Sequence, residues 1–174
     1  MSMTLTTDRL SLRPYRASDA WDLTRYLSDA QVSWTLARVP HPYTLNHAHA
    51  FLAQSPEGFV ITRNGALVGA CGVHPRDKDG MSCFEIGYWI GKPFWGRGFA
   101  SEAATALVGY WFGATGAADI YAGHFVDNPA SGRVLEKIGF APVDWGLYHC
   151  AARGRQVPHR WLRLTATQWK TGLS

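Results

Sequence analysis

Three short apolar runs, separated by turn residues, lie in the middle of the chain. They are Phe59–Thr62, Ala66–Cys71 and Cys83–Ile90, and runs of this length between turn residues predict β-strands. Asn64–Gly65 stands between the first two runs, where an Asn-Gly pair is a strong signal for a tight hairpin. Asp77–Gly80 marks the next turn. The pattern therefore predicts an antiparallel meander of three strands.

Apolar residues at helical spacing precede the meander, after a first strand at Leu10–Arg13 that alternates apolar and polar positions. Ser18 or Asp19 can cap a first helix and Thr44 a second, because short polar side chains accept hydrogen bonds from first-turn amides. The expected apolar positions are Trp21, Leu23 and Leu27 in the first helix and Leu45, Ala48, Phe51 and Leu52 in the second.

The second half of the chain begins with a glycine-rich segment that opens an apolar helix. Asn128–Pro129 then starts a shorter helix, since Asn is favoured at the N-cap and Pro at the first helical position. Gly139 ends that helix, and Phe140 can fold back on it. The remaining strands are expected at Ile120–Phe125, Leu147–Cys150 and Arg160–Leu164. The order of elements predicts an α+β fold around one mixed sheet.

Composition narrows the class of protein. The chain has 174 residues, of which 47% are hydrophobic and 17% charged, so a disordered protein is excluded. No linker, repeat or low-complexity segment interrupts it, and a single domain over residues 1–174 is expected. The three cysteines are widely spaced, and nothing resembles a signal peptide or a membrane span. A cytoplasmic protein without a membrane partner is expected.

Charge is distributed unevenly along the chain. No acidic residue follows Asp144, whereas five basic residues do: Arg153, Arg155, Arg160, Arg163 and Lys170. This stretch either attracts an anionic partner, such as CoA phosphates, RNA or an acidic substrate, or is a solvated basic face. The basic residues are not part of a nucleic-acid-binding motif, so nucleic acid is not predicted as the main partner.

The segment from Trp95 to Ala103 has the features of an anion site. Gly96 and Gly98 permit backbone conformations that a side chain would forbid. The helix that follows has unpaired first-turn N–H groups and a partial positive charge at its start, which suit a pyrophosphate. Arg97 can add a charge-assisted contact. A nucleotide P-loop lacks support because no Gly-Lys-Ser/Thr follows, and a dinucleotide fingerprint would need a third glycine.

Three stretches together resemble the GCN5-related N-acetyltransferase (GNAT) superfamily, in its RimJ/RimL-like branch. They are Asp8–Pro14 with Ser18–Ala20, Glu85–Ile90 with Trp95–Ala103, and Asp127–Ser131 with Val134–Phe140. Trp95 stands where many members have Gln or Arg, and this branch accepts an aromatic residue there. The resemblance implies a mostly antiparallel sheet of seven strands with strands four and five splayed apart, flanked by about four helices.

The resemblance also implies acetyl-CoA as the donor and a primary amine as the acceptor, either a protein N-terminus or a small molecule. Pantetheine would run between the splayed strands, along the backbone near Trp89 and Ile90. The residues implied to hold the pyrophosphate are Trp95, Gly96, Arg97, Gly98, Phe99, Ala100 and Ser101. Asn128, Ser131 and Lys137 would line the CoA side.

Acetyl transfer requires a neutral amine and a leaving thiolate, so a base and an acid are expected at the site. Glu85 is the first candidate base, because alternation places it with Gly87 and Trp89 on one face of its strand; a solvated strand carboxylate is the alternative. His74 and His124 are further candidates. Ser131 is the candidate acid by resemblance, with helix capping as its alternative. Tyr148 is the second candidate acid.

The acceptor side carries no readable motif. Trp34, Tyr43 and Trp145 are candidates to line an aromatic acceptor cleft, with core packing as the alternative for each. No metal is predicted, since His47 and His49 do not share a helix face. The competing functions are a non-catalytic acyl-CoA-binding or regulatory module, and a ribosome- or RNA-associated protein that uses the basic C-terminal stretch. The protein is expected as a monomer or homodimer.

Overall fold

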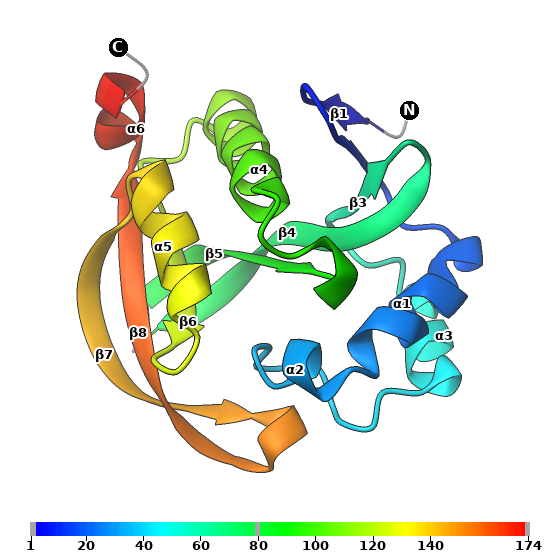
Figure 1. Ribbon diagram of the computed structural model, residues 1–174. Coiled ribbons are helices and arrows are strands. Elements are labelled where there is room, and N and C mark those ends of the chain that lie inside the picture. The colour runs from blue at the N-terminus through cyan, green and yellow to red at the C-terminus, as the bar shows by residue number, and fades with distance from the viewer. Residues whose placement is uncertain (1–2, 79–80, 173–174) are drawn as a thin grey trace.

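A computed structural model describes residues 3–78 and 81–172, and its centre is one mixed sheet (Figure 1). Within the described residues the sheet has eight strands in the order β1-β2-β3-β4-β5-β6-β8-β7. The strands are β1 (Leu5–Thr6), β2 (Ser11–Arg13), β3 (Phe59–Arg63), β4 (Ala66–Lys78), β5 (Met81–Ile90), β6 (Asp119–Phe125), β7 (Ala141–Cys150) and β8 (Arg155–Thr165). The expected count of seven was one short because β1 has only two residues.

The hairpin between β3 and β4 confirms the Asn-Gly prediction. Asn64 has φ 50° and Gly65 has φ 82°, and two successive positive φ values are what a type I′ turn requires. The next turn, expected at Asp77–Gly80, lies partly outside the described residues. β4 and β5 flank it and pair antiparallel from Gly69–Ile90 to Lys78–Met81, so the three-strand meander is confirmed.

Helices pack on both faces of the sheet. They are α1 (Ala20–Leu27), α2 (Ala30–Ser33), α3 (Leu45–Ala53), α4 (Phe99–Thr115), α5 (Pro129–Ile138) and α6 (Ala166–Gly172), with short 3-10 turns at Ala17–Asp19, Lys92–Phe94 and Ala151–Arg153. About four helices were expected, and the two that were missed, α2 and α6, are among the shortest. Figure 1 shows α4 and α5 side by side over one face, while α1, α2 and α3 gather away from them.

Two main cores follow from this division, beside a minor cluster of Phe125, Cys150 and Val157. The larger one joins α4 and α5 to the sheet through residues such as Ile86, Leu107 and Leu162. The smaller one joins α1 and α3 to the sheet through Leu23 and Val60. Trp21 was expected on the apolar side of the first helix, but this prediction was wrong because the side chain is 73% exposed. Leu23 and Leu27, expected on the same side of the helix, are buried as predicted.

β5 and β6 are parallel neighbours that separate after a short contact. Their only paired positions among the described residues are Glu85 with Tyr121 and Ile86 with Ala122. β5 continues to Ile90 and β6 to Phe125 without further pairing to each other. The expected splay between these two strands is confirmed, and it opens the sheet between Gly87–Ile90 and Gly123–Phe125. None of the described helices is both long and apolar enough to cross a membrane.

Candidate active site

The opening between β5 and β6 exposes backbone groups of β5. The Gly91 N–H donates to the Val68 carbonyl at 2.8 Å, so Gly91 faces β4. Backbone groups of successive strand residues point to opposite sides, and those of Ile90 and Tyr88 therefore point into the opening. Of the two residues expected to bond a pantetheine chain, the geometry selects Ile90, while the backbone of Trp89 faces β4.

The glycine loop lies directly after this opening. Gly96 has φ 73° and Gly98 has φ 76°, both in the left-handed region that favours glycine. Gly98 is the N-cap of α4, and the first helical bond runs from the Glu102 N–H to the Gly98 carbonyl at 3.1 Å. The amides of Phe99, Ala100 and Ser101 precede that bond, so no carbonyl of the helix pairs with them. These first-turn backbone amides are the groups on which the expected anion site depends.

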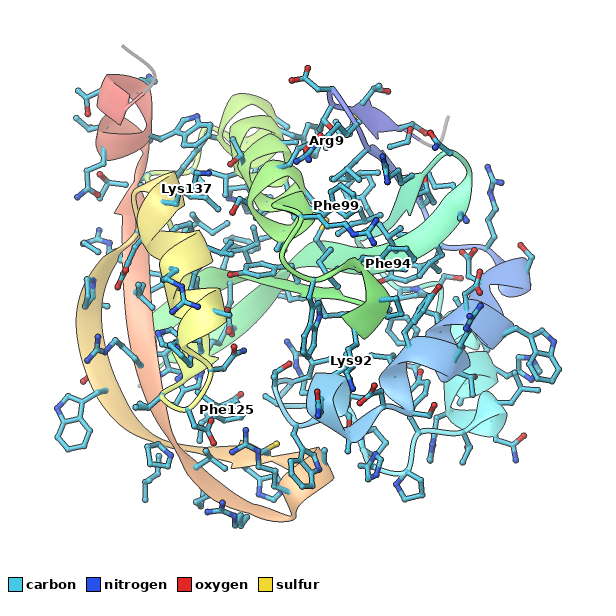
Figure 2. All side chains as sticks on the ribbon, in the orientation of Figure 1. Arg9, Lys92, Phe94, Phe99, Phe125 and Lys137 are labelled. Carbon is cyan, nitrogen blue, oxygen red and sulfur yellow. The ribbon has the colours of Figure 1, made fainter. Side chains whose placement is uncertain are left out.

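The N-terminal segment holds this loop in place. The Glu102 carboxylate accepts hydrogen bonds from the Thr7 hydroxyl at 2.6 Å, the Arg9 amide at 2.9 Å and the Arg9 guanidinium at 2.7 Å. The same guanidinium donates to the Arg97 carbonyl at 3.0 Å and lies 5.1 Å from the Phe99 ring centre (Figure 2). Burial alone would raise the pKa of the Glu102 carboxyl, but the bonds from Thr7 and Arg9 outweigh it and lower the pKa.

Trp95 occupies part of the opening. Its indole N–H donates to the Ile90 carbonyl at 2.6 Å, the same carbonyl that points toward β6. The side chain is 44% exposed, so it covers the strand edge without being buried. An incoming chain that bonds to the Ile90 carbonyl would compete with this indole.

One wall of the opening is the first turn of α5. The Asn128 side chain accepts a hydrogen bond from the Ser131 amide at 3.4 Å, so Asn128 is the N-cap. The Ser131 hydroxyl is free of that role and lies 3.0 Å from the Tyr88 hydroxyl. Burial raises the pKa of Tyr88. His124 is under the same helix, against Gly132, whereas Lys137 lies at the far end of α5 from Phe125 (Figure 2).

The opposite face of the sheet holds Glu85. Its carboxylate forms an ion pair with Arg76 at 2.7 Å, and both side chains are largely buried. The Arg76 guanidinium stacks 3.6 Å from the Trp161 ring centre and 4.8 Å from that of Tyr148. Tyr148, the second candidate acid, therefore lies with Glu85 and not with Ser131.

Two histidines share the face of Glu85. His74 is the register partner of Glu85, and burial together with Arg38 lowers its pKa. His159 packs among the rings of Phe125, Tyr148 and Trp161, and is only 5% exposed. Burial, followed by the charges of Arg76 and His124, lowers the pKa of His159 to about 4. Both imidazoles are therefore held in the neutral form near neutral pH.

A cleft of about 650 Å³ leads to the opening from outside. Its walls come from α2, the glycine loop, the β6–α5 turn and the β7–β8 hairpin, through Gln31, Trp34, Thr35, Trp95, Asp127, Asn128, Ala152, Arg153 and Arg155. Trp34 lines this cleft together with Trp95 and Asn128, two residues expected on the CoA side. Tyr43 is instead buried in the smaller core, and Trp145 is 80% exposed on the other face of the hairpin, beside Arg160.

Arg153 joins two walls of this cleft. Its guanidinium pairs with Asp127 at 2.5 Å and donates to the Trp34 carbonyl at 2.9 and 2.7 Å. The bond from Arg153 lowers the pKa of the Asp127 carboxyl. Arg153 is therefore a structural clamp between the end of α2 and the end of β6.

Residues 9–141 match the family described as "Acetyltransferase (GNAT) domain". The chain belongs to the GNAT family of acetyltransferases. An uncharacterized N-acetyltransferase of Bacillus licheniformis, p20, is 31% identical over 88% of this chain and 91% of its own. The [Ribosomal protein uS5]-alanine N-acetyltransferase of Escherichia coli is 25% identical over 97% of this chain and 93% of its own. This second relative agrees with the expected RimJ/RimL-like branch.

Solved structures share the GNAT fold. A GNAT-family acetyltransferase from Bacillus anthracis superposes with a TM-score of 0.80 at 24% identity, over 94% of this chain and 98% of that one. Mycobacterium smegmatis RimJ, in complex with CoA-disulfide, has a TM-score of 0.78 at 21% identity, over 96% of this chain and 88% of that one.

Membership in the GNAT family makes this chain an acetyl-CoA-dependent acyltransferase. No role was predicted from the sequence for three residues that shape the site: Tyr88, Arg76 and Arg9. Arg9 and Tyr88 act through partners on distant elements, whereas Arg76 pairs with Glu85 on the neighbouring strand. Tyr88 is two residues after Ile86 and therefore shares its face of the strand. The face of the Tyr88 side chain could thus have been predicted, but its contact with Ser131 could not.

Proposed function

We propose that this GNAT enzyme transfers an acetyl group from acetyl-CoA to a primary amine by direct attack within a ternary complex. The observation that carries the proposal is the opening between β5 and β6. It has the glycine loop at its edge, the Tyr88–Ser131 hydroxyls on one face of the sheet and the Glu85 carboxylate on the other.

The donor side follows from backbone groups. The first-turn amides of α4 would bind the CoA pyrophosphate, and the helix dipole favours that negative charge. Pantetheine would then enter the opening and bond to the backbone of Ile90 in place of the Trp95 indole. The thioester would come to rest where β5 and β6 meet again, at Ile86 and Ala122.

The chemistry divides between the two faces at that junction. On one side Glu85, held in place by Arg76, receives a proton from the acceptor amine directly or through water. The amine nitrogen then forms a bond to the acetyl carbon and gives up its second proton to water, and the carbon–sulfur bond breaks. The electron pair stays on sulfur, on the side of Ser131, and the thiolate is protonated before or after CoA leaves. Tyr148 stands with Glu85, which favours Ser131 for the leaving-group side.

The acceptor is an amine at a protein N-terminus or on a small molecule. The Escherichia coli relative acts, by its name, on the alanine of a ribosomal protein, which favours a protein N-terminus. The exposed Trp34 at the cleft offers an aromatic surface for either class.

A release assay for CoA thiol, with acetyl-CoA and a panel of N-terminal peptides and small amines, tests the proposal. Turnover is expected with at least one acceptor. Glu85→Gln should lower kcat by about 100-fold near neutral pH, as loss of a general base does. Glu136→Gln, an exposed carboxylate on α5, is the matched control and should not change kcat. Tight CoA binding without turnover on any acceptor would instead indicate a non-catalytic acyl-CoA-binding module.

The RNA-associated alternative is tested separately at the basic stretch. Charge reversal at Arg153 is unsuitable because that residue clamps Asp127 to α2. Arg155 and Arg160 are exposed, so reversal of these two charges should abolish any RNA binding that the stretch provides. Salt-sensitive RNA binding that disappears in this variant would favour the alternative.

A further inference from the structure

Two hydroxyl groups meet at the α5 wall of the opening. The Tyr88 hydroxyl comes from β5, and the Ser131 hydroxyl comes from the first turn of α5, 3.0 Å away. The Tyr88 hydroxyl also lies 3.1 Å from the Ser131 backbone carbonyl. The Asn128 side chain caps the same turn by accepting from the Ser131 amide, which places the Ser131 hydroxyl beside Tyr88.

The contact between Tyr88 and Ser131 allows two arrangements of its hydrogen bonds. Tyr88 has one hydrogen and two acceptors, the carbonyl and the hydroxyl oxygen of Ser131. When Tyr88 donates to the carbonyl, the Ser131 hydroxyl can donate to Tyr88. When Tyr88 donates to the Ser131 hydroxyl oxygen, the Ser131 hydrogen is released and can point to a third group. A rotation of two O–H bonds converts one arrangement into the other.

Proton transfer from this pair to a thiolate is unfavourable. A thiol has a pKa of about 8.5 and a tyrosine about 10, and burial raises the pKa of Tyr88 further. The Tyr88 hydroxyl would therefore not give its proton to a leaving thiolate near neutral pH, and the aliphatic Ser131 hydroxyl is a weaker acid still. Both can donate a hydrogen bond, and hydrogen bonds to an ionised acceptor are the strong ones.

We propose that Tyr88 is a positioning residue that directs the Ser131 hydroxyl hydrogen onto the sulfur of the departing CoA. This inference rests on the proposed function. As the carbon–sulfur bond breaks, sulfur keeps the electron pair. The Ser131 hydroxyl donates a hydrogen bond to the sulfur, and the Tyr88 hydroxyl donates one to the Ser131 oxygen. No proton leaves either hydroxyl, and the thiolate takes its proton from solvent on release.

The ionisation of CoA bound to the protein measures this directly, without any acceptor. The ultraviolet absorbance of the CoA thiolate is titrated against pH as the difference between the CoA-loaded and the free protein. In the unaltered protein the bound thiol should have a lower pKa than free CoA. Tyr88→Phe and Ser131→Ala should each raise it by about one unit, a tenfold change expected for one charge-assisted hydrogen bond.

Three further variants control for structural effects. Ser131→Thr keeps a hydroxyl and should retain the low thiol pKa. Tyr88→Phe combined with Ser131→Ala should not exceed the effect of Ser131→Ala alone, since Tyr88 acts through Ser131. Tyr110→Phe removes a hydroxyl from α4 for which the described residues provide no hydrogen-bond partner, and it should change nothing.

The outcomes separate this inference from the function on which it rests. If the unaltered protein does not bind CoA, the proposed function fails. If CoA binds and its thiol has the same pKa in the unaltered protein, Tyr88→Phe and Ser131→Ala, the proposed function stands and this inference is overturned. Should Tyr88→Phe fail to fold, the comparison of Ser131→Ala with Ser131→Thr decides, because equal thiol pKa values in those two variants would refute the role of the hydroxyl.

Discussion

Glu102 links the N-terminal segment to the glycine loop, and replacing it with glutamine tests how the loop is held. Its carboxylate accepts from the Thr7 hydroxyl, the Arg9 amide and the Arg9 guanidinium, the closest ion-pair contact being 2.6 Å. Glutamine keeps the size of the side chain but places an amide donor against the guanidinium, so two donors face each other.

The expected loss of stability can be worked out from these contacts. Hydrogen bonds to a charged group contribute about 1.5–3 kcal/mol each. The Arg9 side chain is 47% exposed and Glu102 17%, and exposed ion pairs contribute only about 0–1 kcal/mol. We therefore expect Glu102→Gln to lower the free energy of unfolding by about 2 kcal/mol, which is roughly 4–8 °C in Tm for a chain of this length.

Two assays check this expectation. Thermal unfolding at several pH values compares Glu102→Gln with the unaltered protein. The lowered pKa of Glu102 means that its contribution is present above the ordinary carboxyl pKa and is lost as pH falls through the folded-state value. The difference in Tm should therefore be largest near neutral pH and shrink in acid. Calorimetric titration with CoA should show roughly fivefold weaker binding, since loosening the loop adds about 1 kcal/mol of ordering cost.

Glu136→Gln again supplies the control, because that carboxylate is exposed on α5. The reasoning would be refuted if Glu102→Gln melted at the same temperature as this control and bound CoA equally well. A Tm difference that did not shrink at low pH would also contradict it, because the loss would then not depend on the charge of Glu102.

Three other predictions concern the loop, the clamp and the buried imidazole. Gly98→Ala forces a side chain into φ 76° and should cost about 1–2 kcal/mol and weaken CoA binding, whereas Gly113→Ala on α4 should stabilise the helix, as chemical unfolding and calorimetry can show. Arg153→Ala removes both the Asp127 pair and the bond to α2, so it should lower Tm more than Asp127→Asn does; equal losses would argue against a clamp. The pKa of His159 is lowered to about 4 in the folded protein, so this imidazole takes up a proton at higher pH in the unfolded chain than in the folded one. The free energy of unfolding should therefore fall on the order of 3 kcal/mol as pH drops from about 6.5 to 4. His159→Phe should remove that part of the pH dependence in urea unfolding, and an unchanged pH profile would contradict the assignment.

Features set by neighbouring residues could be predicted from the sequence. The Asn64–Gly65 hairpin, the Asn128 cap and the left-handed Gly98 depend on conformations that these residue types adopt locally. The glycine loop was readable for the same reason. Helix α2 was missed because four residues are too few to show a helical period.

Features set by long-range pairing could not be read in this way. Arg9 and Glu102 are 93 residues apart, and Tyr88 and Ser131 are 43 apart, so neither contact leaves a local signal. Trp145 shows a second reason. A register shift between Pro142 and Asp144 adds one residue to β7, and such a shift moves the following side chains to the other face of the strand. Trp145 is 80% exposed, whereas its place in the last hairpin of the resembled fold had suggested the cleft or the core.

If the donor takes the place of the Trp95 indole at the Ile90 carbonyl as proposed, the hydrogen bond between them gives the protein an optical reporter of donor binding. An indole that leaves a strand edge changes both its hydrogen bonding and its exposure to water, and its fluorescence changes with them. The chain has eight tryptophans, so the part of the emission lost in Trp95→Phe identifies this one. Donor occupancy could then be followed in real time with any candidate acceptor present, and with no label attached.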